Sequence, residues 1–127
     1  MLSGLVARVR SLWTELGAEP REMSAAEHDR ALAWSSHLPQ VASSALALTL
    51  DGAGFGPREL GPGRDSTRLA ASSPEMWSAI CLENADLIEP AVHALEATLS
   101  ELRAALRGRD ADAIHLFFAR GSRWARG

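Results

Sequence analysis

Apolar residues recur every three or four positions along most of this chain, and that spacing constrains its fold more than any other feature. Seven of them between Leu2 and Leu16 fall on one side of a helix, and Gly17 is a natural stop. Similar patterns predict helices over residues 25–36, 40–50, 76–106 and 111–123. The 127 residues include 23 alanines and 18 leucines, which favour helix. The sequence therefore predicts one all-α domain spanning residues 1–127.

Prolines and capping residues set the expected helix ends. Ser24 and Glu27 form a capping-box pattern before the second helix. Pro39 disfavours a continuous helix, so we expect His37 at a break between two helices. Pro90 predicts a kink or junction within residues 76–106. The helix over residues 40–50 carries no charge, which predicts burial on most of its sides. Residues 51–63 should form a loop, followed by a helical segment that starts at residue 64 or 65 and ends at residue 71.

Composition excludes several classes of protein. A single cysteine, Cys81, rules out an internal disulfide framework and a cysteine-based zinc cluster, and no metal site is expected. The longest uncharged run, residues 31–50, contains His, Pro, Gln and serines, so it is a poor membrane span. A net charge of -3 does not suit a nucleic-acid surface. No targeting segment is recognised, which predicts a cytoplasmic protein. The glycines of residues 52–57 do not have the spacing of a dinucleotide-binding loop.

Arg64, Asp65 and Arg68 form the most informative polar segment, directly after a glycine-rich stretch. On a helix starting at Arg64, the two arginines would be four residues apart and share a face. A guanidinium group can grip a carboxylate at two points, which predicts an anion-binding role. The alternative is a helix start with two solvated arginines and Asp65 as its cap.

His37 and Trp77 are the other candidates. A histidine at a helix break can offer its ring to a ligand, or it can bond a loose backbone carbonyl. Trp77 lies one turn into its helix and is expected either in the core or as a wall of a pocket.

Five short motifs then occur in a recognisable order: Glu27-His28-Asp29, Ser36-His37-Leu38-Pro39, Gly63-Arg64-Asp65-Ser66-Thr67-Arg68-Leu69-Ala70, Ser73-Pro74-Glu75-Met76-Trp77 and Glu83-Asn84. This order resembles the C-terminal helical half of the prephenate/arogenate dehydrogenase family. The resemblance extends from the first helix to about Leu106. It implies the helical dimerisation domain found C-terminal to a Rossmann domain in 6-phosphogluconate-dehydrogenase-like enzymes. The Rossmann domain itself, which binds NAD or NADP, is not recognised in these residues.

The resemblance also implies the chemistry and the roles of the candidates. The family oxidatively decarboxylates prephenate to 4-hydroxyphenylpyruvate for tyrosine biosynthesis, and its catalytic histidine lies in the Rossmann domain, so none is expected in this chain. Arg68 would grip a substrate carboxylate, and His37 would lie near the ring end of the substrate. Arg64 and Asp65 would stand at the pocket mouth, and Trp77 would be a pocket wall or a structural residue.

Two features depart from the family pattern. Gln40 follows the proline of the Ser-His-Leu-Pro motif, where the family often has histidine. Gly63 meets Arg64 directly, whereas the family often has an aromatic or apolar residue between the glycines and the Arg-Asp pair, and this shorter spacing concerns the loop shape.

We therefore expect a substrate-binding and dimerisation domain that acts on prephenate or arogenate as a homodimer. It would be a fragment, a truncated product, or one chain of a split enzyme that works with a separate Rossmann-domain chain. Alone, it is expected to be inactive. The alternative is a non-catalytic helical dimerisation or regulatory module derived from the same scaffold.

Overall fold

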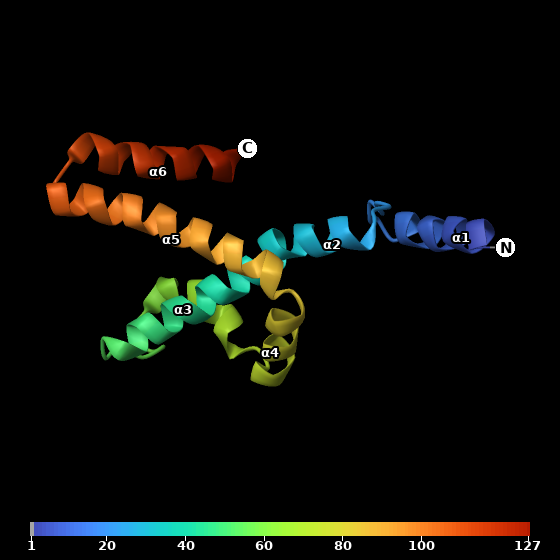
Figure 1. Ribbon diagram of the computed structural model, residues 1–127, viewed down its shortest axis with the longest axis horizontal. Helices are drawn as coiled ribbons and strands as arrows, with labels where there is room; N and C mark the ends of the chain where they lie inside the picture. Colours follow the sequence, from blue (N-terminus) through green and yellow to red (C-terminus); the bar gives the residue numbers. More distant parts are fainter. Residues whose placement is uncertain (1) are drawn as a thin grey trace.

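The computed structural model describes residues 2–127, and these residues form helices and connecting loops without any strand (Figure 1). The prediction of an all-α fold is confirmed. The elements in chain order are α1 (Leu2–Glu15), α2 (Ala25–Leu32), the π-helical turn η1 (Ala33–His37), α3 (Leu38–Gly52), the 3₁₀ segment η2 (Gly61–Ala71), α4 (Pro74–Glu83), α5 (Ala85–Gly108) and α6 (Ala111–Arg126). No helix in this part of the chain is long and apolar enough to cross a bilayer.

The predicted helix break at His37 is wrong. The chain passes from α2 through η1 into α3 without leaving the helical region of the backbone. Within η1 the turn widens, and the Leu38 amide donates to the carbonyl of Ala33, five residues back. A proline lacks an amide and its ring crowds the carbonyl four residues earlier. The widened turn gives Pro39 room, so the helix continues and His37 stays within it.

The long pattern over residues 76–106 divides at Asn84 and not at Pro90. Asn84 has φ -113° and ψ 22°, which ends α4 and begins α5. Pro90 lies inside α5. The last helix is also longer than predicted and ends at Arg126.

The buried core lies where η1, α3 and α5 meet (Figure 1). Ala33 and Ala91 have no exposed surface, so the small side chains let η1 and α5 approach closely. Ile88 is the other buried apolar residue among those described. The three remaining buried residues, His37, Gln40 and Ser43, are polar. This small core therefore consists half of groups that need hydrogen-bond partners.

Helices α5 and α6 form an antiparallel hairpin at the C-terminal end (Figure 1). Arg109 turns the chain with a positive φ of 51°, and the Asp110 side chain accepts from the Ala113 amide at 3.0 Å. Arg120 and Glu101 bridge the two helices at 2.6 Å.

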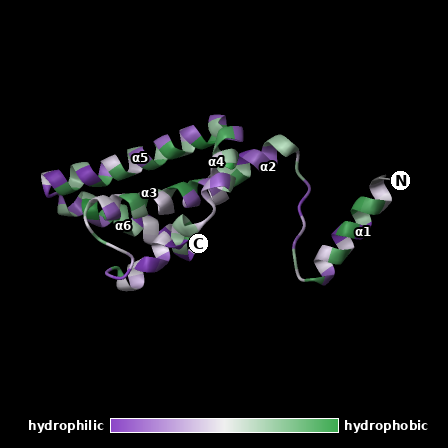
Figure 2. Ribbon diagram, turned by 90° about the horizontal axis from the view of Figure 1, so that it is seen from below, coloured by the Kyte–Doolittle hydropathy of each residue, from purple (hydrophilic) through white to green (hydrophobic). Residues whose placement is uncertain are grey.

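Helix α1 stands apart from the other helices in both views (Figures 1 and 2). Its apolar stripe between Leu5 and Leu16 lies in solvent, including Leu12 at 55% exposure and Trp13 at 52%. The predicted burial of the helix over residues 40–50 is also wrong for a single chain, because Leu46 and Leu48 are exposed. Amphipathic helices owe most of their stability to packing of the apolar face, so these faces lack their partner within one chain.

The capping box at α2 makes the stability depend on pH. The Glu27 amide donates to Ser24 Oγ at 3.2 Å, and the Ser24 amide donates to the Glu27 carboxylate at 2.8 Å. The bond from the Ser24 amide, with help from its hydroxyl, holds the pKa of Glu27 below its ordinary value of 4.5. A lowered folded-state pKa stabilises the fold above the ordinary value, and that contribution is lost as pH falls through the folded-state value.

We therefore expect the Glu27→Gln variant to be less stable than wild type at pH 7, and the difference to shrink below pH 4.5. Urea unfolding of both proteins at pH 7 and at about pH 3, at one protein concentration, measures it. An equal difference at both pH values would mean that the carboxylate charge has no role.

Candidate ligand-binding site

Arg64, Asp65 and Arg68 lie in η2, which begins at Gly61, three or four residues earlier than predicted. The segment is a 3₁₀ helix, in which residues three apart, not four, lie above one another. Accordingly, Arg68 Nε lies 3.5 Å from the Asp65 carboxylate, and both side chains are mostly exposed. The expectation that Arg64 and Arg68 share one face of an α-helix is therefore wrong.

Both arginines nevertheless line one cleft. It has a volume of about 660 Å³, within the usual range for small-molecule sites. Its lining residues come from η2, α3 and the loop between them: Ala47, Pro57, Gly61, Pro62, Arg64, Asp65, Thr67, Arg68, Ala70 and Ala71. The lining combines two guanidinium groups and one carboxylate with a largely apolar floor. Such a cleft suits an organic anion that carries a carboxylate and an apolar body.

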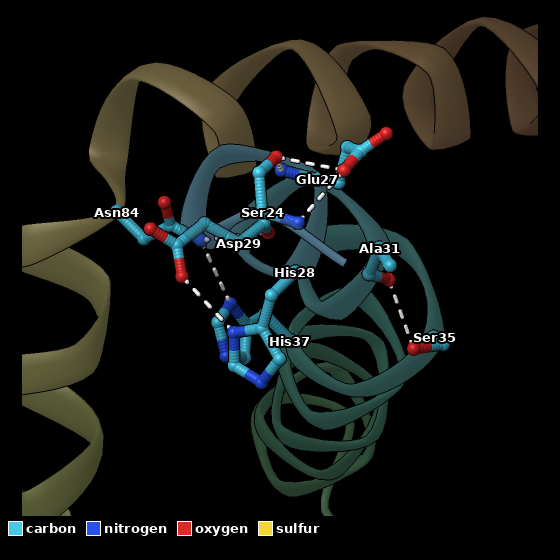
Figure 3. Close-up of polar contacts among 8 residues, drawn as sticks. All are labelled: Ser24, Glu27, His28, Asp29, Ala31, Ser35, His37 and Asn84. Atoms are coloured by element: carbon cyan, nitrogen blue, oxygen red, sulfur yellow. Dashed lines mark hydrogen bonds and ion pairs between the residues drawn. The ribbon is translucent and has the colours of Figure 1, made fainter. Parts of the chain in front are cut away.

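His37 lies in a different set of contacts. Its ring is buried and packs edge to face against Trp77, with centroids 5.8 Å apart and an interplanar angle of 81°. Its Nδ1 lies 3.3 Å from the side-chain amide nitrogen of Asn84 (Figure 3). Trp77 is half-buried, and its Nε1 is buried without a hydrogen-bond partner among residues 2–127. Within one chain, Trp77 therefore packs against the ring of His37.

Trp77 also lines a second, apolar groove of about 460 Å³ between α3 and α4. The groove residues are Gln40, Val41, Ser44, Ala45, Leu48, Pro74, Trp77, Ser78 and Cys81. The five candidates therefore form two groups within one chain. Arg64, Asp65 and Arg68 share the cleft, whereas His37 and Trp77 contact each other.

Gln40 and Ser43 connect α3 to η2. Gln40 Nε2 donates to the carbonyl of Leu69 at 2.7 Å, and its Oε1 accepts from the Ser72 hydroxyl at 3.4 Å. Ser43 Oγ donates to the carbonyl of Ser66 at 3.0 Å. These bonds hold the backbone on both sides of Arg68, which has no backbone bond of its own to α3. The residues were not among the sequence candidates. The only signal was Gln40 itself, a polar residue at the start of the uncharged stretch over residues 40–50.

We expect the Gln40→Ala variant to lose about 0.5–1.5 kcal/mol of unfolding free energy, because the partly buried hydrogen bond from α3 to the Leu69 carbonyl is lost. Urea denaturation at fixed protein concentration measures the change. The Ser35→Ala variant is the matched control, since Ser35 Oγ bonds only the carbonyl of Ala31 within its own helix. Equal stability of the two variants would contradict a tethering role for Gln40.

The glycines at positions 52, 54 and 56 do not fit a dinucleotide. Gly52 ends helix α3 and the other two glycines follow it, whereas a dinucleotide-binding loop follows a strand and opens a helix. Gly54 has a φ of 83°, and its amide donates to the carbonyl of Asp51 at 2.9 Å, which closes a turn at the helix end. Its backbone amide is thus used by the chain itself.

These observations define an all-helical domain with an arginine-lined cleft, a buried histidine and large unpartnered apolar faces. Residues 24–120 match the family described as prephenate dehydrogenase, dimerization domain. The chain belongs to this family, as its motifs suggested.

The curated relatives that match the chain are also dehydrogenases. The chain is 37% identical over 113 residues to cyclohexadienyl dehydrogenase of Zymomonas mobilis. The aligned residues cover 84% of this chain and 39% of that protein. It is 30% identical over 120 residues to prephenate dehydrogenase of Lactococcus lactis, covering 91% of this chain and 34% of that protein. The chain therefore spans less than half the length of the curated relatives it matches.

A solved structure shares the fold. The crystal structure of Synechocystis arogenate dehydrogenase superposes with a TM-score of 0.76 at 23% identity, over 98% of this chain and 48% of that chain. This agreement supports the helical architecture described above.

Proposed function

We propose that this chain supplies part of the substrate pocket and the dimer interface of a prephenate dehydrogenase. In that role, it contributes to the oxidative decarboxylation of prephenate to 4-hydroxyphenylpyruvate in tyrosine biosynthesis. Arogenate is the other candidate substrate. The cofactor, NAD or NADP, would bind outside residues 2–127, and it would accept the hydride. The names of the matched dehydrogenases support this reaction class. For a biosynthetic enzyme of this kind we propose a cytoplasmic location.

The arginine-lined cleft is the observation that carries the substrate proposal. Prephenate is a dianion, and a planar guanidinium group is the side chain best suited to hold a carboxylate in a fixed orientation. Hydride transfer requires the substrate ring to face the nicotinamide at a set angle, which a two-point clamp by Arg68 would supply. Asp65 orients the guanidinium group through the contact at 3.5 Å. Arg64 would add positive charge at the mouth of the cleft.

The exposed surface supports the homodimer. The chain exposes 10385 Å², whereas a compact monomer of 13.6 kDa exposes only about 6,600 Å². Obligate dimers bury about 2,000–5,000 Å² in total over both partners, so the excess on each chain is more than enough surface for such an interface. It includes the α1 stripe and apolar residues of α5 and α6, such as Phe118 and Trp124 at 87% exposure.

A second candidate is a helical dimerisation or regulatory module without a substrate. The exposure of the arginine pair and the separation of His37 from the cleft within one chain favour it. Ligand binding separates the two proposals, because only the first requires Arg68 to contact an anion.

The proposed function predicts that the chain alone does not reduce nicotinamide cofactor when mixed with prephenate. A dinucleotide site is part of the reaction, and the glycines of this chain do not form one. Absorbance of the reduced cofactor measures the rate. Addition of a Rossmann-domain chain from a matched dehydrogenase should restore turnover. Steady reduction by the chain alone would contradict this division of labour.

A further inference from the structure

The side-chain amide of Asn84 has its orientation fixed by two contacts. Its Nδ2 lies 3.3 Å from the backbone carbonyl oxygen of Asp29 and 3.3 Å from Nδ1 of His37 (Figure 3). A carbonyl oxygen can only accept, so the Asn84 group that faces it must be the NH₂ and not the amide oxygen. The second hydrogen of the same NH₂ is then directed to His37.

This orientation determines which ring nitrogen of His37 carries the proton. Nδ1 faces a donor, so in the neutral ring it must be the nitrogen with the free lone pair. The ring proton therefore lies on Nε2. No residue in the described part of the chain makes a hydrogen bond to Nε2, and this nitrogen is not among the side-chain atoms fully closed off from solvent. His37 is thus a buried ring with one open donor.

Helix capping does not account for this use of Asn84. The residue is the N-cap of α5, a position where an asparagine side chain commonly accepts from the first turn of the helix. Its side chain makes no such cap bond, and the backbone carbonyl of Asn84 alone receives the amides of Leu87 and Ile88. The side chain instead contacts Asp29 in α2, 55 residues earlier in the sequence, and His37 in η1, 47 residues earlier.

We propose that Asn84 is a positioning residue that holds His37 in the tautomer with the proton on Nε2. In an assembly that brings the bound anion to this ring, which lies apart from the arginine-lined cleft within one chain, His37 would donate a hydrogen bond from Nε2 to an oxygen atom of the anion. Trp77 packs against the ring and limits its rotation, with a centroid separation of 5.8 Å. This inference rests on the proposed function for the identity of the anion, whereas the tautomer itself is a property of the chain alone.

Nitrogen NMR of the imidazole ring tests the tautomer directly. The chain has four histidines, and the other three are exposed, so a His28→Gln, His93→Gln, His115→Gln variant leaves His37 as the only signal. Long-range proton–nitrogen spectra at about pH 8, where an ordinary histidine is neutral, should show the proton on Nε2. A proton on Nδ1 would overturn the proposal.

The Asn84→Asp variant, made in the same background, reverses the polarity of the contact. Aspartate is as good an N-cap as asparagine, so α5 is retained, but its carboxylate only accepts. We expect the proton to appear on Nδ1, whether or not Nε2 also carries one. The Asn84→Ser variant keeps a capping group and removes the amide donor, and it should show a mixture of tautomers. A folded Asn84→Asp protein with Nδ1 still unprotonated would contradict the positioning role.

Binding of prephenate separates this inference from the proposed function. Asn84→Asp should weaken binding at least tenfold, and the neighbouring exposed Glu83→Ala should leave it unchanged. If wild type binds no prephenate while the tautomer responds as expected, the proposed function fails and the positioning of His37 stands. If Asn84→Asp binds prephenate as wild type does, the donor role of His37 is wrong.

Discussion

Replacing Leu12 with glutamate is expected to convert the proposed dimer into monomers. Leu12 is in the centre of the α1 stripe, and it is 55% exposed in one chain. In a two-fold dimer every substitution occurs twice. Loss of two buried leucines alone costs about 3–6 kcal/mol, before the cost of placing two carboxylates in an apolar interface is added. The dissociation constant should therefore rise at least about a hundredfold. Sedimentation velocity over a range of protein concentrations measures the change.

Ser11→Glu is the matched control for this experiment. Ser11 precedes Leu12 on the same helix but lies away from the stripe, because successive helical residues are turned by about 100°. It adds the same charge and should leave the dimer intact. Wild-type protein that sediments as a monomer at high concentration would contradict the proposed interface, as would equal dissociation of both variants.

Arg68→Ala is expected to weaken binding of 4-hydroxyphenylpyruvate about tenfold to thirtyfold. A charge-assisted pair with a carboxylate contributes about 1.5–3 kcal/mol, and we take the lower half of this range because Arg68 is largely exposed in one chain. Arg68→Lys keeps the charge but loses the planar fork, so it should fall between alanine and wild type. Isothermal titration calorimetry gives the three dissociation constants.

Two controls accompany the Arg68 variants. Arg107→Ala removes one exposed positive charge in the last turn of α5, outside the cleft, and should bind as wild type does. Arg64→Ala removes a charge at the cleft mouth and should have a smaller effect than Arg68→Ala. If Arg107→Ala weakens binding as much as Arg68→Ala, the ligand responds to net charge and not to a clamp.

The helical elements were predictable because each has a local signal. Ser24 with Glu27, Ser73 with Pro74, and Asp110 lie at helix starts that the structure confirms. Pro39 misled the prediction, because sequence patterns do not show whether a helix will break or widen by one residue around a proline. The position of the later junction also depended on one backbone conformation, that of Asn84, and not on Pro90.

The site could be predicted only in part, for a similar reason. Residue chemistry and motif order indicated Arg68 and His37 as candidates, because a guanidinium group can bind a carboxylate and an imidazole ring can hydrogen-bond a ligand. The contacts that position them join α3 to η2 and α5 to η1 across long stretches of sequence, through Gln40, Ser43 and Asn84. Such contacts depend on how helices cross, which no local pattern contains.

A calorimetric titration of the wild-type chain with prephenate tests the central claim most directly. We predict saturable binding with one site per chain, by a protein that sediments as a dimer under the same conditions. The heat signal should be reduced in Arg68→Ala and preserved in Arg107→Ala. A well-folded dimer that binds neither prephenate nor arogenate at millimolar concentration would contradict the claim that this domain forms part of a substrate pocket.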